Sequence, residues 1–440
     1  MTSSINVQHN FNVLNTHKKY LWITALACCI LMLYFIFSNS ASLTKAGSEI
    51  APAPVTPQPN KLIAPMKKDS LRKYSKLHYE SIVVDSHNDF IWQVYDKGAT
   101  FNECSFTQSD LPRFRSGGVD VQFFSVLIPM KEVKNSFSFV KGQIKRLNQI
   151  EQENSGDIEF AKSYEDIMSI LAKKKICGLI GVEGGTAIEN NLDNINKLYV
   201  MGVRYIGLTW NNSNLIGSSA KDETEKGKKG GLTDFGKKVI ERMNELGMLI
   251  DVAHLGENSF WDVYNLSTQP VFSSHSNAYA INPHFRNLTD EQIQVIAKSG
   301  GVIQVNFYDE FLDKNAKRNR TKNAYQLYRK ELDELNEKYG DNLEKYNEER
   351  DKFLKEKKLT GGTTLDKVIE HIDYIKNLVG ADYVGLGSDF DGGISPPAEL
   401  YDASCYPMIT KKLIEKGYSD KKKKKILGLN ILRLFKQVCK

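Results

Sequence analysis

The sequence predicts an α/β protein organised as a (β/α)8 TIM-type barrel, and two observations support this fold class. From residue 71 onward, short apolar runs typical of buried strands alternate with longer amphipathic runs typical of helices, which is the pattern of a parallel sheet. There are eight strand-like runs, the number that closes such a barrel. They span residues 81–85, 119–128, 176–182, 203–209, 248–253, 270–274, 301–307 and 383–388.

Residues 234–246 illustrate the helical runs between these strands. Val239 and Met243 recur at helical spacing, and Thr233 is a suitable N-cap residue. Residues 314–358 are dense in charged side chains, so we expect a charged helical insertion of two helices in the barrel. A lid, a dimer arm and a solvated addition are open alternatives for this insertion.

Composition and charge exclude some classes of protein. The chain has 440 residues, of which 41% are hydrophobic and 25% charged, as in an ordinary globular protein. The net charge of +6 is modest, and the basic clusters lack interleaved aromatic residues, so no nucleic-acid partner is predicted. We expect the five lysines at 421–425 to form the solvated face of a terminal helix, with Ile426 and Ile431 packing inward.

The first 70 residues depart from globular composition. Residues 20–37 are uncharged and apolar except for Thr24, and about 18 such residues are just enough to cross a bilayer. Two lysines precede this run, which predicts a cytoplasmic N-terminus and an exported domain in the periplasm or at the cell surface. The expected segments are a cytoplasmic tail (1–19), a transmembrane signal-anchor (20–38), a flexible proline-rich linker (39–70) and the barrel domain (71–440).

Two questions about the exported chain stay open. A cleaved signal peptide, or a lipoprotein signal around Cys28, is an alternative to the anchor because small residues lie near the apolar run. The downstream cysteines lack C-x-x-C spacing, so we assign them no catalytic role and no pairing. They are Cys104, Cys177, Cys405 and Cys439.

Histidines and carboxylates recur where the predicted strands end. They are His87 and Asp89 after the first strand, Glu183 after the third, His254 after the fifth, His275 after the sixth and Asp389 after the eighth. Active sites in this fold gather at the C-terminal ends of the strands, so these side chains are expected to converge. Each alone is more often structural, but three imidazoles and three acids at one mouth predict a site for zinc or a similar metal.

These motifs resemble the membrane dipeptidase (renal dipeptidase) family of zinc peptidases, which are amidohydrolase-like metal-dependent hydrolases. The resemblance covers about residues 79–435. The matching motifs are DSHND at 85–89, VEGG at 182–185, MLIDVAH at 248–254, SHS at 274–276, HFRN at 284–287, VNFY at 305–308 and GSDFDG at 387–392.

The resemblance implies a cofactor of two Zn²⁺ ions per chain. His87 and Asp89 would bind one ion, His254 and His275 would bind the second, and Glu183 would bridge both. A water shared between two cations has a lowered pKa and supplies hydroxide near neutral pH. This metal-bridging hydroxide would attack the peptide bond of a dipeptide.

The resemblance also implies roles for four further side chains. Asp389 would take the proton from the water and pass it to the leaving amine. Arg286 would bind the free carboxylate of the substrate, a task that suits a planar guanidinium, and Tyr308 would line the pocket. Trp210 stands where animal members have a histidine; an indole can donate a hydrogen bond or stack but cannot carry a proton as imidazole does.

We therefore expect a zinc-dependent dipeptidase, held at the membrane by its N-terminal helix and acting on dipeptides. Two alternatives for the function stay open, a related metal hydrolase of another amide, lactone or β-lactam, and a catalytically silent barrel that serves as a binding module. For the assembly of the chain, a homodimer is an open alternative.

Overall fold

The computed structural model describes residues 73–439, apart from residues 105, 228, 317–327 and most of 340–362. The predicted tail, transmembrane segment and linker lie outside the described residues. Among the helices of the described part, none combines the length and the apolar composition that crossing a membrane requires.

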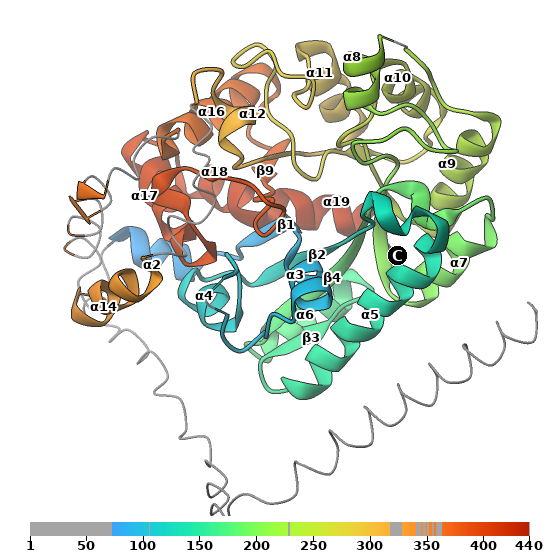
Figure 1. Ribbon diagram of the computed structural model, residues 1–440. Helices are drawn as coiled ribbons and strands as arrows, with labels where there is room; N and C mark the ends of the chain where they lie inside the picture. Colours follow the sequence, from blue (N-terminus) through green and yellow to red (C-terminus); the bar gives the residue numbers. More distant parts are fainter. Residues whose placement is uncertain are drawn as a thin grey trace, which may run out of the picture. The chain divides into compact units, whose positions relative to one another are not determined.

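A curled parallel sheet forms the centre of the fold (Figure 1). Six strands pair in this order: β1 (Val84–Asn88), β2 (Val121–Leu127), β4 (Ile176–Glu183), β5 (Val203–Gly207), β6 (Leu249–Asp251) and β7 (Val271–Phe272). Strands β8 (Ile303–Val305) and β9 (Val384–Leu386) pair with each other. Single bridges join the two groups, Ser273 to Ile303 on one side and Asn88 to Phe390 on the other.

These links are consistent with a TIM-type barrel, and each of the eight predicted strand runs contains or overlaps a strand. Strand β3 (Ile158–Phe160) was not predicted from the sequence; it pairs with β4 outside this order. Its three residues are too short to give a strand-like pattern, and only the first is fully buried.

Helices surround the strands (Figure 1). The helix predicted at 234–246 is confirmed at both ends, because Thr233 accepts a hydrogen bond from the Gly236 N–H and Gly247 adopts the left-handed conformation that ends it. The α-helices are α2 (Lys73–Tyr79), α3 (Phe90–Lys97), α4 (Leu111–Ser116), α5 (Ser136–Glu153), α6 (Tyr164–Ala172), α7 (Asp193–Val200), α8 (Ala220–Lys226), α9 (Asp234–Leu246), α10 (Glu257–Leu266), α11 (Asp290–Ser299), α12 (Asp309–Leu312), α14 (Arg329–Tyr339), α16 (Leu365–Val379), α17 (Tyr406–Glu415), α18 (Asp420–Lys424) and α19 (Asn430–Val438).

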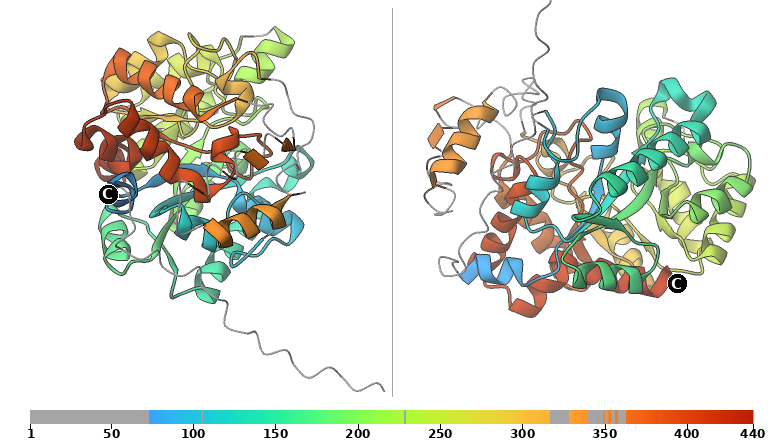
Figure 2. Two further views of the ribbon diagram at one scale, coloured as in Figure 1. Left: turned by 90° about the vertical axis from the view of Figure 1, so that its left-hand side faces the viewer. Right: turned by 90° about the horizontal axis from the view of Figure 1, so that it is seen from below.

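The inner face of the sheet has its own hydrophobic core. The ring of Tyr205 on β5 lies 5.8 Å from the ring of Phe123 on β2 and 5.6 Å from the ring of Phe272 on β7. Since these strands are not neighbours in the sheet, their rings meet only because the sheet curls. Phe435 of α19 packs on Phe123 at 6.2 Å, so the C-terminal helix, red in Figures 1 and 2, lies against the inner core.

Two charged segments can be compared with their predictions. One predicted insertion helix is present as α14, and most of the rest of 314–358 lies outside the described residues. The prediction that all five lysines at 421–425 are solvated is wrong for Lys423, which is buried. Its ammonium donates to the carbonyl of Tyr418 and pairs with Asp420, which satisfies the charge. The inward packing of Ile426 and Ile431 is confirmed.

Candidate metal centre

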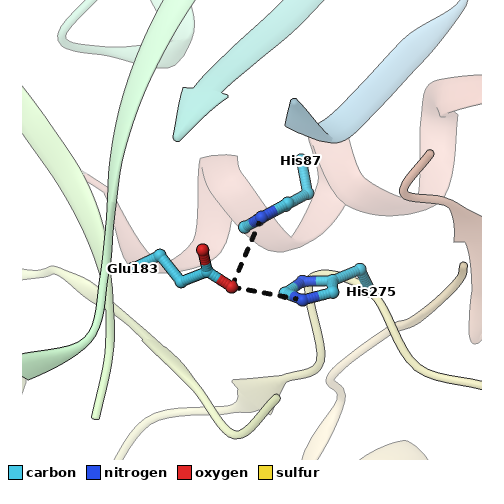
Figure 3. A group of neighbouring side chains, drawn as sticks. All are labelled: His87, Glu183 and His275. Carbon is cyan, nitrogen blue, oxygen red and sulfur yellow. Dashed lines mark ion pairs between the residues drawn. The ribbon is translucent and has the colours of Figure 1, made fainter. Parts of the chain in front are cut away.

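The predicted metal ligands and the predicted proton carrier Asp389 converge at the carboxyl ends of five strands, which are β1, β4, β6, β7 and β9. The Nε2 atom of His87 lies 3.7 Å from Glu183 Oε1, 3.9 Å from Asp89 Oδ1 and 4.0 Å from Asp389 Oδ1. All these side chains are buried. Figure 3 shows His87 and His275 turned toward the same carboxylate oxygen of Glu183.

Glu183, the last residue of β4, is at the centre of this cluster. Its Oε1 atom lies 2.9 Å from His254 Nε2, 3.5 Å from His275 Nε2 and 3.7 Å from His87 Nε2. One carboxylate oxygen therefore contacts three imidazoles that come from three different strand ends.

Each imidazole is oriented through its other nitrogen. The Nδ1 atoms of His87, His254 and His275 lie 3.0, 3.2 and 2.7 Å from partner oxygens. These partners are Tyr205 Oη, Asn211 Oδ1 and Ser274 Oγ, respectively.

For two of the histidines these contacts fix the tautomer. Ser274 donates its only hydroxyl proton to Asp251 Oδ2, 2.6 Å away, so it accepts from the Nδ1–H of His275. The amide oxygen of Asn211 likewise accepts from the Nδ1–H of His254. Both rings therefore present an Nε2 lone pair to the centre, as metal-ligating histidines do.

These lone pairs make the site a match for a cation. His254 Nε2 and His275 Nε2 lie 3.1 Å apart, close to the spacing of about 3.3 Å for two nitrogens that each lie ~2.0 Å from one tetrahedral zinc. His87 Nε2 and Asp89 Oδ1 are buried and have no hydrogen-bond partner among the described residues. The donor set of imidazoles and carboxylates thus fits zinc or a similar divalent metal.

Two overlapping groups within this set have ligand atoms within 4.8 Å of one another. One contains His87, Glu183 and His275, and the other contains His87, Asp89 and Asp389. Each group could hold a metal ion, and His87 belongs to both groups.

The electrostatics of the cluster also favour a cation. Burial, followed by repulsion from Asp389, raises the pKa of Asp89 well above its usual value, and burial followed by repulsion from Asp89 does the same for Glu183. Burial lowers the pKa of His254 and His275 well below the usual value. Neutral imidazoles and carboxylates that resist ionisation are the groups that a bound cation stabilises as ligands.

Backbone conformation at two of the strand ends is unusual. His254 has a φ of 66° and Asp389 a φ of 65°, a left-handed conformation that residues other than glycine adopt at a cost of about 1–3 kcal/mol. Such strain is concentrated at functional sites, and here it occurs at two residues that turn into the cluster.

Asp389 has a second anchored oxygen. Its Oδ2 atom accepts a hydrogen bond from Asn306 Nδ2 at 3.0 Å, while Oδ1 faces His87. Burial raises the pKa of Asp389 to about 7, so this carboxyl group can hold or release a proton near neutral pH.

Arg286 places a buried positive charge beside the cluster. It donates from Nη2 to the carbonyl of His275 at 3.2 Å, and its guanidinium lies over the ring of Phe311. Burial lowers its pKa to about 10, so it stays charged at neutral pH.

Tyr308 is half-buried and packs edge-on against Phe311 at 4.7 Å. Trp210 is also half-buried, and a Cβ atom built on Gly184 would lie 3.3 Å from Trp210 Cβ, so Trp210 lies beside the loop that follows Glu183.

The chain matches the family model described as "Membrane dipeptidase (Peptidase family M19)" over residues 71–440. The chain belongs to the membrane dipeptidase family. This match spans the whole barrel and every residue of the cluster.

Several solved structures are similar to this chain in fold. The probable dipeptidase PvdM from Pseudomonas aeruginosa is 24% identical with a TM-score of 0.69, over 84% of this chain and 98% of that one. A metallo peptidase from Rhodobacter sphaeroides, liganded with a phosphinate mimic of the dipeptide L-Ala-D-Ala, is 23% identical with a TM-score of 0.66 over 81% and 99%. An amidohydrolase from Pseudomonas aeruginosa is 22% identical with a TM-score of 0.64 over 83% and 99%.

The residues that support the ligands were not predicted from the sequence. Asp85, Tyr205, Asn211, Asp251 and Asn306 each hold a predicted site residue, or the serine before it, by a hydrogen bond. Asp85 and Asp251 carried a usable signal, because an acidic residue within an apolar strand needs a buried partner. The other three had no signal in the sequence, since their partners are distant along the chain.

Proposed function

We propose that the chain is a dizinc dipeptidase on a closed (β/α)8 barrel. Membership of the membrane dipeptidase family supports metal-dependent hydrolysis of dipeptides. The observation that carries the metal-dependent chemistry is the pair of facing lone pairs on His254 and His275, 3.1 Å apart beside Glu183. The two bridges that link β7 to β8 and β9 to β1 support closure of the barrel.

In this proposal the two zinc ions are held by five side chains. His87 and Asp89 would hold one, His254 and His275 the other, and Glu183 would contact both. When bound, the zinc pair would supply a water of lowered pKa as nucleophile and would polarise the substrate carbonyl.

The chain itself supplies proton transfer and substrate binding. Asp389 accepts a proton at Oδ1 while Asn306 holds Oδ2, and then donates it to the amine that leaves. Arg286 pairs with the free carboxylate of the dipeptide, because its guanidinium is buried, charged and supplied with spare N–H donors. Tyr308 and Trp210 form walls of the pocket. The dipeptide mimic bound by the Rhodobacter sphaeroides peptidase supports a dipeptide as the substrate class.

We also propose that residues 20–38 anchor the enzyme in a membrane with the barrel on the exported side. The uncharged apolar run and the lysines before it support this. Protease added to cells with an opened outer envelope and an intact plasma membrane is expected to digest the barrel domain of the full chain, and a barrel that is protected until the plasma membrane is lysed would contradict the orientation.

The proposed function is tested on the full chain purified in detergent. Dialysis against a chelator is expected to remove dipeptide hydrolysis, and zinc is expected to restore it with two ions per chain by elemental analysis. Comparison of dipeptides with lactone, β-lactam and other amide substrates separates the dipeptidase from a related hydrolase. Hydrolysis that persists without metal would overturn the proposal.

A further inference from the structure

The guanidinium of Arg286 lies over an aromatic ring that comes from a neighbouring segment of the barrel. Its central carbon lies 5.4 Å from the centroid of Phe311 and over the face of the ring. Arg286 follows β7, whereas Phe311 belongs to α12 after β8. A cation at this distance from a ring face is attracted by the ring quadrupole, more strongly when both are shielded from water.

The ring of Phe311 is itself held on two sides. Tyr308 packs against it at 4.7 Å with the planes 76° apart, and His284 packs against it at 4.7 Å. His284 also accepts a hydrogen bond at Nδ1 from the Arg286 N–H, 3.2 Å away. Arg286, Phe311 and His284 thus form a closed set of contacts that fixes the position of the ring.

The guanidinium is buried and only part of its donor capacity is used. Nη2 donates to the carbonyl of His275 at 3.2 Å, and Nε has no hydrogen-bond partner among the described residues. Face contact with a ring leaves the edge of a guanidinium, where its N–H donors lie, available to a planar anion. The carbonyl of His275 places that edge beside the metal ligands.

We propose that Phe311 is a positioning residue that holds the Arg286 guanidinium in the plane required to bind a free C-terminal carboxylate, and so makes the site selective for unblocked dipeptides. This inference rests on the proposed function of the site. Phe311 acts through Arg286 and contacts no reacting atom. Tyr308 and His284 serve to keep its ring in place.

The test compares two substrates in the zinc-loaded full chain, a dipeptide that the wild type cleaves and the C-terminal carboxamide of the same dipeptide. Phe311→Leu removes the ring face. We expect the KM for the free acid to rise about tenfold, which corresponds to roughly 1.4 kcal/mol. This value lies between those for an exposed and a desolvated cation–π contact, as befits a buried Arg286 and a half-buried Phe311. The kcat for the acid and the KM for the carboxamide are expected to stay within about twofold.

Three further variants complete the design. Phe311→Trp keeps an aromatic face and is expected to keep the wild-type KM for the acid. Phe311→Met removes the face while keeping flexible apolar bulk, and it replaces the leucine variant in the comparison if that variant does not fold. Phe285→Leu is the matched control, because Phe285 stacks on the same His284 at 4.3 Å; its ratio of the two KM values is expected to equal that of the wild type.

The outcomes separate the inference from the proposed function. A wild type that cleaves no dipeptide overturns both. A wild type that cleaves the acid and the carboxamide equally well overturns the inference alone. The same holds if loss of the Phe311 ring raises both KM values alike, or if Phe285→Leu reproduces the selective rise.

Discussion

Each side of the metal centre has a hydrogen-bonded pair of an aspartate and a serine, and the two pairs have different roles. On the β6–β7 side, Asp251 accepts from the N–H and the hydroxyl of Ser274, at 2.8 and 2.6 Å. On the β9–β1 side, Asp85 accepts from the N–H and the hydroxyl of Ser388, at 2.9 and 2.7 Å. Each serine immediately precedes a site residue, His275 or Asp389.

The difference lies in what else the serine hydroxyl contacts. Ser274 lies 2.7 Å from His275 Nδ1 and therefore sets the tautomer of a metal ligand. Ser388 instead lies 3.2 Å from the backbone carbonyl of His87. Strands β6 and β7 are also paired over two residues, whereas β9 and β1 are joined by a single bridge. One Asp–Ser pair thus orients a ligand, and the other holds together a weakly paired edge of the ring.

The largest expected effect is on stability at that edge. Asp85→Ala removes the acceptor of two buried N–H groups, those of Ser388 and His87, and the nearer acceptor of the Ser388 hydroxyl. We expect a loss of about 3–5 kcal/mol in the free energy of unfolding, since each stranded donor costs about 1–3 kcal/mol. Urea denaturation of the metal-free protein measures it. A loss below that of Asp251→Ala would contradict the structural role of the β9–β1 pair.

His371 lies outside the metal centre and differs from the histidines of the centre, because both of its ring nitrogens have hydrogen-bond partners within the protein. Nδ1 accepts from the Ala278 N–H at 3.1 Å and Nε2 donates to the Leu312 carbonyl at 3.0 Å. Burial lowers its pKa to about 4 from 6.5. The folded state therefore resists protonation of His371. The stability that the neutral imidazole contributes is fully present above pH 6.5 and is lost as the pH falls toward 4.

We expect His371 to account for roughly 3 kcal/mol of the stability lost between pH 7 and pH 4. Urea denaturation of the wild type and of His371→Gln across this pH range measures the part of the free energy of unfolding that depends on His371. The two proteins should differ in slope between pH 6.5 and 4, and parallel curves would contradict the assignment.

The next effect is on metal binding. Ser274→Ala removes the acceptor for His275 Nδ1–H, so we expect zinc affinity at the His254–His275 position to fall by about 10–100-fold, as for other residues that orient ligands. Competition with a chromogenic chelator measures it. Ser388→Ala is the matched control, which should lower stability and leave zinc affinity near that of the wild type. Equal losses of affinity in both variants would remove the distinction between the two sides.

The smallest expected effect comes from Tyr205→Phe. The change removes only the hydroxyl 3.0 Å from His87 Nδ1 and keeps the ring packed on Phe123 and Phe272. Zinc affinity is expected to fall about tenfold, with the thermal midpoint of the metal-free protein almost unchanged. An unchanged affinity would show that the core fixes His87 without this hydrogen bond.

The sequence predicted the features that depend on local pattern. Apolar runs located the eight barrel strands, and the side chains just after them located the ligands, because parallel strands present their carboxyl ends at one edge. The start of α9 followed from a threonine cap, which accepts a hydrogen bond from the Gly236 N–H. Resemblance to a family, and not spacing, assigned Arg286 and Tyr308 to the site.

The features that escaped prediction depend on contacts between distant segments. Asp85 and Ser388 are 303 positions apart in the sequence, so the acidic residue in an apolar strand indicates that Asp85 needs a buried partner but does not indicate which residue that partner is. The bond from Tyr205 to His87 arises because a core ring on β5 reaches across the curled sheet. Lys423 lies buried within a run of lysines because the carbonyl of Tyr418 and Asp420 meet its charge.

The most direct test is anomalous diffraction at the zinc absorption edge from crystals of the zinc-loaded protein. The account predicts two peaks that flank Glu183, one in contact with His254 Nε2 and His275 Nε2 and the other with His87 Nε2 and Asp89. A single peak remote from Glu183, or full occupancy at a site that does not include these imidazoles, would contradict it.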